Sequence, residues 1–396
     1  MRISLTVLII FFTTVDMTFS QDRERARDLG IKTGILETGS FNAITDVDGV
    51  LVGHKTIIKG DDVRTGVTAI LPHSGNLFRD RVPAAVYVGN GFGKALGFTQ
   101  VQELGELETP IALTNTLSIF NTAYGVADFI LNQPGNENVR SVNPVVGETN
   151  DGWLNNIRKR IITPDDVHDA IKAAESGPVA EGNVGAGTGT RALGFKAGIG
   201  TSSRLLPDEY GGYTVGVLVQ SNFGGILTLN GAPVGQELNN HYMAGNTPRT
   251  TNPDSFADSR NENGYDFDVD GSIMIVVATN APITSRNLER LAKRAFLGIS
   301  RVGGFASNGS GDYVIAFSTH PDVRQNPNHD ENTLTLKELT NSAMTPLFLA
   351  AVEATEEAIL NSLFMAETMN GDDGRTMEAL PVDEVMEILK KYNAAD

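Results

Sequence analysis

The sequence predicts an α+β fold. Short apolar runs rich in β-branched residues indicate strands, and longer segments with apolar residues every three or four positions indicate helices. The two kinds of segment alternate irregularly, and no repeat of fixed period is visible. The chain has 396 residues, 40% of them hydrophobic and 20% charged, which is enough for a large core. Two packed sheets flanked by helices fit this pattern, as do other α+β layouts.

The predicted elements follow from these patterns. The segments predicted as strands are 50–57, 66–71, 84–88, 213–221, 225–229, 272–279 and 312–317. The segments predicted as helices are 118–132, 163–175, 284–302, 336–369 and 381–392. Thr163 followed by Pro164 is a typical helix start, and Pro346 is expected to break the helix that contains it. Residues 21–34 are predicted to be a polar arm, and residues 231–270 a long loop.

The first twenty residues have the features of a secretory signal peptide. Arg2 supplies the positive charge, residues 5–15 form an apolar core, and Thr18-Phe19-Ser20 is a small-x-small cleavage site, although Asp16 departs from the pattern. The apolar run is too short to span a membrane. The sequence therefore predicts cleavage after Ser20 and export, to the periplasm in a cell that has one, as a protein without a membrane anchor.

The composition argues against several functions. The chain has no cysteine, which excludes disulfides, thiolate catalysis and sulfur-ligated metals. Its six histidines are not at metal-ligand spacing, and no G-x-S-x-G motif accompanies them. The formal net charge of −17 argues against nucleic-acid binding, because no basic stripe is available to neutralise phosphates.

Gly271 and Ser272 stand where the polar loop ends and an apolar strand begins. This layout suits a self-cleaving hydrolase, in which the Ser272 hydroxyl attacks the Gly271 carbonyl and Ser272 becomes a new N-terminus. The free α-amine, which titrates near pH ~7.7, can then act as the local base. Gly271 allows the strained backbone that exposes the carbonyl. Taken alone, a Gly-Ser step is more commonly just the start of a strand.

Five further residues are candidates for the site. Ser310 and Asp312 lie two residues apart where a Gly-rich turn enters a strand, so their side chains lie on one face if the chain is extended. Such a pair can relay a proton from the nucleophile, or it can belong to a plain hairpin turn. Asn222 ends a strand and can either face a developing oxyanion or serve as a turn former. Glu148 is either a buried carboxylate for a substrate ammonium or an exposed turn acid, and Trp153 either walls that pocket or belongs to the core.

Residues 187–192 match the dinucleotide-binding pattern G-x-G-x-x-A. No apolar strand precedes the motif, and no acidic residue follows at the distance that a βαβ unit requires. We therefore expect a glycine loop that brings backbone N–H groups near a substrate, and not a nucleotide site.

Together these motifs resemble the DmpA-type aminopeptidases, which include the L-aminopeptidase/D-esterases and the β-peptidyl aminopeptidases. The matching stretches are 25–30, 42–47, 64–68, 146–153, 182–189, 216–224, 271–272 and 310–312, so the resemblance spans nearly the whole mature chain. Residues 146–153, VGETNDGW, bring the chain closest to the β-peptidyl aminopeptidase (BapA) branch. At position 312 the chain has Asp where that branch has the longer Glu.

The resemblance implies a four-layer αββα sandwich, similar to the N-terminal-nucleophile hydrolases but differently connected. It implies one structural domain built from two cleaved pieces, an α-subunit (21–271) and a β-subunit (272–396), assembled as a tetramer of heterodimers. Ser272 would be the nucleophile, with Ser310 and Asp312 handling protons and Asn222 in the oxyanion hole. Glu148 would hold the free amine of short peptide substrates, and no cofactor would take part.

Two other functions remain open. One is an L-aminopeptidase/D-esterase that prefers α-amino acids, since the sequence does not rank α- against β-aminoacyl substrates. The other, from a different class, is a non-catalytic periplasmic binding protein that uses the same pocket. A transferase of the ornithine acetyltransferase type shares the general plan, but Ser272 argues against it because that type is expected to have a threonine nucleophile.

Overall fold

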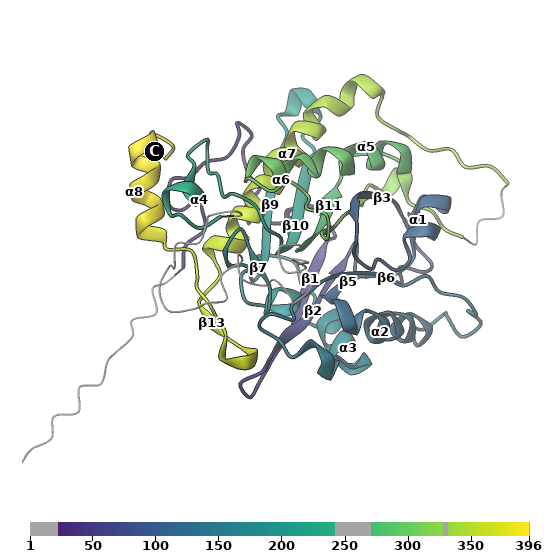
Figure 1. The fold of residues 1–396 in the computed structure, drawn as a ribbon. Coiled ribbons are helices and arrows are strands. Elements are labelled where there is room, and N and C mark those ends of the chain that lie inside the picture. Colours follow the sequence, from purple (N-terminus) through teal and green to yellow (C-terminus); the bar gives the residue numbers. More distant parts are fainter. Residues whose placement is uncertain (1–22, 242–270, 328–331, 396) are drawn as a thin grey trace, which may run out of the picture.

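The protein folds as four layers, a helical layer on each side of two packed sheets (Figure 1). Helices α5 (Ser285–Ala295), α6 (Leu297–Arg301) and α7 (Met344–Phe364) cover one side, and helices α2 (Ile119–Leu131) and α3 (Pro164–Lys172) cover the other. The α+β class and the αββα layering predicted above are confirmed. The computed structural model describes residues 23–241, 271–327 and 332–395.

The six-stranded sheet has the order β4-β3-β12-β11-β10-β9. All residues of its three central strands are buried, because helices cover one face and the other sheet covers the opposite face. β11 is parallel to β12 and antiparallel to β10, so the end of β10 meets the beginnings of β11 and β12. The strands are β3 (Val82–Gly91), β4 (Glu106–Leu107), β9 (Ile199–Leu205), β10 (Thr214–Asn222), β11 (Ser272–Thr279) and β12 (Gly311–Ser318).

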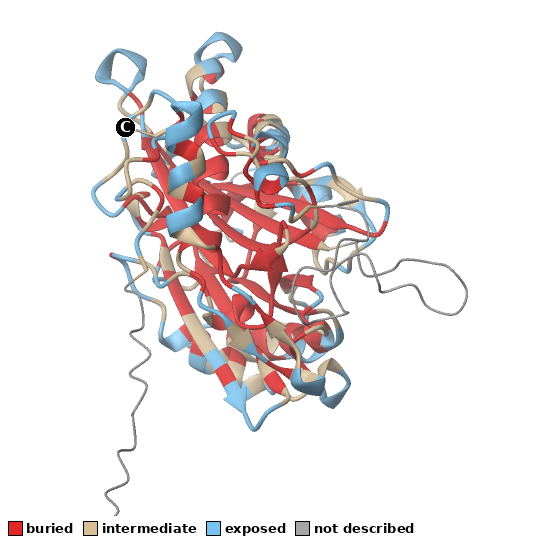
Figure 2. Cartoon of the chain, turned by 60° about the vertical axis from the view of Figure 1, so that its left-hand side comes forward, coloured by how far each residue is buried: buried red, intermediate tan, exposed pale blue. Residues whose placement is uncertain are grey.

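The four-stranded sheet has the order β1-β2-β5-β6. β1 (Leu51–Lys59) and β2 (Val63–Leu71) form a long hairpin, whose tip is exposed in Figure 2. β5 (Ile111–Asn115) and β6 (Val145–Thr149) are parallel and buried throughout, as expected for strands covered on both faces. α2 and α3 pack on this sheet through an apolar cluster that includes Val126.

The remaining α-helices and strands lie outside the two large sheets. They are α1 (Phe98–Leu104), α4 (Val234–Glu237), α8 (Val382–Tyr392), the hairpin β7 (Arg191–Ala192) with β8 (Phe195–Lys196), and the hairpin β13 (Met369–Asn370) with β14 (Thr376–Met377). Buried residues concentrate in the two sheets and on the helix faces that pack against them (Figure 2).

The N-terminal arm is bound to α7 by a buried ion network. Arg27 donates two hydrogen bonds to Glu357, at 3.0 and 2.6 Å. Arg204 of β9 reaches the same carboxylate at 2.7 Å and the Glu353 carboxylate at 3.2 Å. The arm and β9 precede Gly271, whereas α7 follows Ser272. This network therefore joins the two parts of the chain that flank the predicted cleavage point.

Several predicted elements are wrong in place or extent. Segment 225–229 is not a strand, because Gly225 makes only an isolated bridge to Gly304 and the chain turns at Asn230 with φ 46°. Pro346 lies in the first turn of α7, so it helps to begin the helix and does not break it, and residues 336–343 are not α-helical. The helix predicted at 284–302 divides at Phe296.

Three strands of the two sheets with five or more residues, β5, β6 and β9, were not predicted. β9 reads as polar because Thr201, Ser202 and Ser203 occupy its middle, yet all three are buried and their hydroxyls are hydrogen-bonded. β5 and β6 have only five residues each, which is too short for a clear periodicity.

Candidate active site

Ser272 is the first residue of β11, at the centre of the six-stranded sheet. In the strand register it lies opposite Asn222 of β10 on one side and Gly311 of β12 on the other. Its side chain is buried, and its Oγ accepts a hydrogen bond from the Gly311 N–H at 3.2 Å. The structure therefore brings together three segments that are far apart in the sequence.

Gly271 lies in close contact with the end of β10. A Cβ on this residue would stand 1.7 Å from the Asn222 carbonyl oxygen and 2.4 Å from the Phe223 Cα, so only glycine fits without moving the backbone. The Gly271 carbonyl oxygen faces the Gly311 N–H at 3.3 Å. One N–H group is thus shared between the Gly271 carbonyl oxygen and the Ser272 Oγ.

Ser310 and Asp312 are in direct contact. The Ser310 hydroxyl donates to Asp312 Oδ1 at 2.6 Å, and both side chains are buried. They flank Gly311, the residue paired with Ser272. Asn90 of β3, which was not predicted, donates its side-chain N–H groups to the carbonyl oxygens of Ser307 and Ser310 at 2.7 and 2.6 Å. Asn90 therefore holds the turn that leads into β12.

Asn222 has a fixed amide orientation. Its Oδ1 accepts from the Arg191 backbone N–H at 3.2 Å, and its Nδ2 donates to the Asn150 carbonyl oxygen at 3.0 Å. An amide nitrogen carries two hydrogens, so one N–H beyond the bond to Asn150 can still be donated. Because Asn222 is in register with Ser272, that donor can serve a carbonyl oxygen attacked by the serine.

Glu148 is a buried carboxylate near the end of β6, and not an exposed turn acid. Its Oε1 accepts from the Lys94 backbone N–H at 2.7 Å, and its Oε2 accepts from the Thr116 hydroxyl. Burial raises the pKa of Glu148, and these two hydrogen bonds oppose the rise. A buried carboxylate with few donors around it can bind an ammonium group strongly.

Gly93 connects the surroundings of Glu148 with those of Ser272. A Cβ on Gly93 would stand 3.3 Å from Glu148 Oε1 and 3.2 Å from the Gly311 Cα. A Cβ on Gly311 would stand 2.6 Å from the Gly93 Cα and 3.2 Å from Ser272 Oγ. Tyr313 fixes this loop by donating its hydroxyl to the Gly93 carbonyl oxygen at 2.9 Å. The carboxylate and the serine therefore lie on either side of one tight glycine contact.

Trp153 lies in the turn after β6 and is partly exposed. The Arg191 guanidinium lies 4.7 Å and the Arg375 guanidinium 6.0 Å from the centroid of its ring. Since the Arg191 backbone also contacts Asn222, the Trp153 turn lies beside the oxyanion candidate. Trp153 is thus not an interior core residue. That it walls the substrate pocket stays a prediction.

The glycine loop at 187–192 packs against the protein backbone. A Cβ on Gly187 would stand 2.4 Å from the Ile199 nitrogen, and one on Gly189 would stand 2.2 Å from the Arg64 carbonyl oxygen. The N–H groups of Gly187, Thr188 and Thr190 donate to carbonyls of the same loop. These three N–H groups are therefore used within the fold and are not available to a substrate, and a substrate contact from the rest of the loop stays a prediction.

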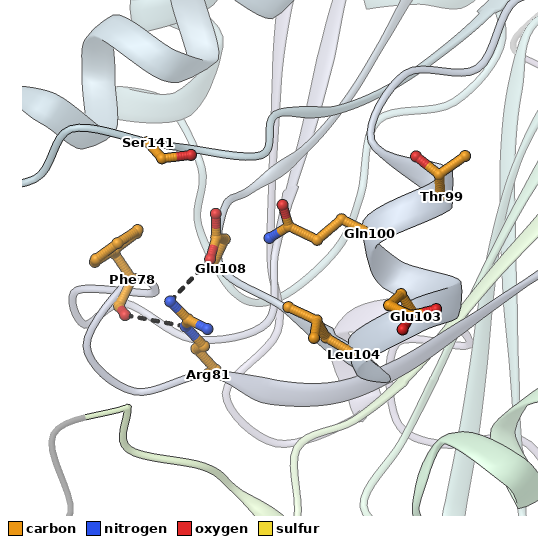
Figure 3. A pocket seen from close by; sticks show the side chains of 8 residues that line it. All are labelled: Phe78, Arg81, Thr99, Gln100, Glu103, Leu104, Glu108 and Ser141. Carbon is orange, nitrogen blue, oxygen red and sulfur yellow. Dashed lines mark hydrogen bonds and ion pairs between the residues drawn. The ribbon is translucent and has the colours of Figure 1, made fainter.

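The described residues contain no group of three or more His, Asp or Glu residues placed to hold a metal ion. Within the same residues, no helix has the length and apolarity needed to cross a membrane. A cavity of about 580 Å³ lies beside α1, where Arg81 forms an ion pair with Glu108 (Figure 3). None of the predicted site residues lines this cavity.

Sequence reasoning missed Asn90, Lys94, Thr116 and Tyr313. Their side chains or backbone groups position the turn before β12, the Gly93 loop and the Glu148 carboxylate. Only Thr116 had a local signal, since it follows the polar end of a short apolar run. The others depend on contacts between distant parts of the chain, which a single sequence does not reveal.

This sandwich of two sheets, with a serine at the start of a central strand, defines a class of hydrolases with a serine nucleophile. The sequence profile described as Peptidase family S58 matches residues 42–377. The chain therefore belongs to this family and is an aminopeptidase that acts on peptides.

Individual relatives support the same assignment. The chain is 42% identical over 385 residues to the beta-peptidyl aminopeptidase BapA of Sphingosinicella microcystinivorans, covering 94% of this chain and 93% of the relative. The solved beta-aminopeptidase of a Burkholderia species is 38% identical, with a TM-score of 0.82 over 93% of this chain and 99% of that one. The solved L-aminopeptidase D-Ala-esterase/amidase of Ochrobactrum anthropi is 35% identical, with a TM-score of 0.83 over 95% of this chain and all of that one. That last structure is described as a prototype of the serine aminopeptidases and a new variant of the Ntn hydrolase fold.

Proposed function

We propose that this chain is a self-processing β-peptidyl aminopeptidase, with Ser272 first cleaving the Gly271–Ser272 bond and then acting as the N-terminal nucleophile. The observation that supports it best is the Gly311 N–H, which faces both the Gly271 carbonyl oxygen and the Ser272 Oγ. A donor in that place polarises the carbonyl that the serine must attack. The two relatives described as beta-peptidyl or beta-aminopeptidases support the substrate class.

Self-cleavage uses only groups of this chain. The Ser272 hydroxyl adds to the Gly271 carbonyl carbon while the Gly311 N–H donates to the carbonyl oxygen. The Ser272 nitrogen then leaves, takes up the hydroxyl proton and becomes a free α-amine, so that an ester joins Gly271 to the Ser272 oxygen. Water hydrolyses this ester and releases the Gly271 carboxylate.

Peptide hydrolysis then follows at the same serine. Glu148 binds the substrate ammonium, and the α-amine of Ser272 accepts the hydroxyl proton as the Oγ attacks the substrate carbonyl. Gly311 and Asn222 donate to the oxyanion, and the Ser310 and Asp312 pair stabilises the protonated amine. The leaving amine takes that proton, and water hydrolyses the acyl-enzyme and regenerates Ser272. No metal or organic cofactor enters the scheme.

The central test is Ser272→Ala. We expect one uncleaved, folded chain with no peptidase activity, whereas the parent should give two bands on a denaturing gel and a smaller fragment that begins at Ser272. Ser221→Ala is the matched control, because Ser221 is a buried serine on the adjacent strand whose hydroxyl has no hydrogen-bond partner among the described residues. A smaller fragment with another N-terminus, or an active Ser272→Ala protein, would refute the proposal.

Glu148 provides an independent test of amine recognition. Removing a carboxylate that pairs with a buried cation costs several kcal/mol, so Glu148→Ala should lower kcat/KM for free-amine substrates by about a hundredfold or more. Chain cleavage should continue, because it does not involve a substrate amine. Unchanged kinetics on free-amine substrates would show that Glu148 does not bind the ammonium.

An L-aminopeptidase/D-esterase with α-amino acid preference is the second candidate, supported by the likeness to the Ochrobactrum anthropi enzyme. β-Homoalanyl and alanyl p-nitroanilides separate the two candidates, because they differ by one backbone carbon. Faster hydrolysis of the alanyl compound would favour the second. A non-catalytic binding protein is excluded if the chain is found as two pieces cleaved at Gly271.

We also propose export after cleavage at Ser20 and assembly as a tetramer of heterodimers. Arg2 and the apolar run support export, although residues 1–22 lie outside the described part of the chain. Mature protein found in the cytoplasm with residues 1–20 attached would refute export. Light scattering of the processed protein tests the assembly.

A further inference from the structure

The two sheets touch directly beneath the candidate site. Gly147 of β6 faces Met274 of β11, and a Cβ on Gly147 would stand 2.2 Å from the Met274 Cε and 3.1 Å from its Cγ. Met274 is fully buried in the cluster between the sheets. Gly147 is followed by Glu148, and Met274 comes two residues after Ser272. The contact therefore joins the strand that carries the carboxylate to the strand that carries the serine.

A polar contact two residues further along β6 joins the same pair of sheets. Gln220 of β10 is fully buried, and its Nε2 lies 2.8 Å from the Thr149 hydroxyl oxygen and 3.1 Å from the Thr114 carbonyl oxygen. Thr149 follows Glu148 in β6, and β10 is the neighbour of β11. The separation of the sheets is thus held on both sides of Glu148, by packing at Gly147 and by hydrogen bonds at Thr149.

We infer that the Gly147–Met274 contact determines the length of aminoacyl group that the site accepts, and so its preference for β- over α-aminoacyl substrates. This inference rests on the proposed function, in which Glu148 holds the amine and Ser272 attacks the carbonyl. A β-amino acid places one more carbon between these two groups, which adds one bond of about 1.5 Å. The spacing between β6 and β11 must match one of the two lengths.

The packing explains why so small a contact can have this effect. Protein interiors are close-packed, so an added methyl group displaces its neighbours and a deleted side chain lets them approach. A displacement of about 1 Å at a reacting group can cost about a hundredfold in rate. Gly147 and Met274 take no part in the proposed chemistry and would act through Glu148 and Ser272, so they are positioning residues.

The experiment measures kcat/KM for β-homoalanyl and alanyl p-nitroanilides with the processed enzyme. Gly147→Ala should push β6 away from β11 and raise the ratio of β- to α-activity by about tenfold or more. Met274→Ala should let the strands approach and lower the ratio by a similar factor. The double variant Gly147→Ala/Met274→Ala relieves the overlap and should return the ratio toward that of the parent.

Two control variants test whether any nearby change would do the same. Met274→Leu conserves volume, and Gly91→Ala adds a methyl group on an exposed residue whose nearest contact is Val88 Cγ1 at 3.6 Å. Both should keep the parent ratio within about twofold. Because the ratio comes from two rate constants of one preparation, a loss of folded protein cancels and does not change it.

Ratios within twofold of the parent in both single variants, with both proteins processed and active, would overturn the inference while leaving the proposed function intact. A double variant as far from the parent ratio as the single ones would also overturn it. If the parent itself hydrolyses neither anilide, the proposed function fails, and that result is read from the parent alone.

Discussion

Glu357 holds the N-terminal arm and β9 onto α7, and its charge should contribute strongly to stability. Its carboxylate is buried and receives hydrogen bonds from Arg27 at 3.0 and 2.6 Å, from Arg204 at 2.7 Å and from Asn42 at 2.5 Å. The perturbation is Glu357→Gln, which keeps the shape of the side chain and removes its charge. It leaves two guanidinium groups without their shared counter-ion.

The size of the effect follows from the pKa. Burial by itself would raise the pKa of Glu357, but the hydrogen bond from Arg27 and the charges of Arg204 and Arg27 lower it from 4.5 to about 2. One pKa unit corresponds to about 1.4 kcal/mol, so this carboxylate contributes about 3 kcal/mol. Breaking a buried ion pair by removing one partner costs about 3–5 kcal/mol, which agrees.

The pH dependence has a definite sign. The carboxyl group is more acidic in the folded state, so its contribution is complete above pH 4.5 and is lost as the pH falls toward 2. Urea unfolding of the parent and of Glu357→Gln should therefore differ by about 3 kcal/mol at neutral pH, and by less when the pH is below 4.5.

Glu356 is the matched control, because it neighbours Glu357 on the same helix but has the opposite electrostatics. Burial raises the pKa of Glu356, against the hydrogen bond from Arg301. Glu356→Gln should thus leave the free energy of unfolding at neutral pH unchanged or higher. Equal stability of the parent and Glu357→Gln at neutral pH, or equal losses in both variants, would refute the reasoning.

Three further predictions concern Asn222, Gly271 and Lys196. Asn222→Ala should lower kcat by about 10²- to 10³-fold with little change in KM, measured by steady-state kinetics, because an oxyanion donor acts in the transition state. Gly271→Ala should block chain cleavage, so that a denaturing gel shows a single band. The added Cβ would stand 1.7 Å from the Asn222 carbonyl oxygen and would displace the Gly271 carbonyl from Ser272. Burial lowers the pKa of Lys196 from 10.5 to about 7. Between these two pH values Lys196 is protonated in the unfolded chain and neutral in the folded one, so folding becomes more favourable as the pH rises. The stability of the parent, measured by urea unfolding, should rise over that interval more than the stability of Lys196→Met.

The sequence was sufficient for the elements whose pattern is regular. β10, β11 and β12 were recognised because their apolar, β-branched runs are continuous, and α2, α3 and α8 because their periodicity is clear. β9 could not be recognised, since it buries a polar sequence that is acceptable only when Asn42 and Val217 supply hydrogen-bond partners. Such strands depend on tertiary contacts, and local preference does not reveal them.

For the candidate site, the sequence pointed to the proposed reacting groups more readily than to the residues that position them. Ser272, Ser310 and Asp312 have local signals in the Gly-Ser step and the Gly-rich turn, and Asn222 lies at a visible strand end. Whether Glu148 is buried could not be decided, because its burial depends on Thr116 and the Lys94 backbone. The Gly93–Gly311 contact could not be predicted from the sequence either, because the two glycines are distant in the chain and meet only in the folded protein.

The shorter acid at position 312 does not prevent contact with its partner, and strand geometry explains why. Ser310 immediately precedes β12 and Asp312 is its second residue, so the extended backbone at the start of the strand sets the separation of the two side chains. Asn90 fixes the turn before β12 through the Ser307 and Ser310 carbonyls, and this brings the Ser310 hydroxyl to 2.6 Å from Asp312. The register of β11 and β12 then places Gly311, between these two residues, opposite Ser272. The contact between Ser310 and Asp312 is therefore positioned by the same sheet that positions Ser272, and it depends on Asn90 as well as on the length of the acid.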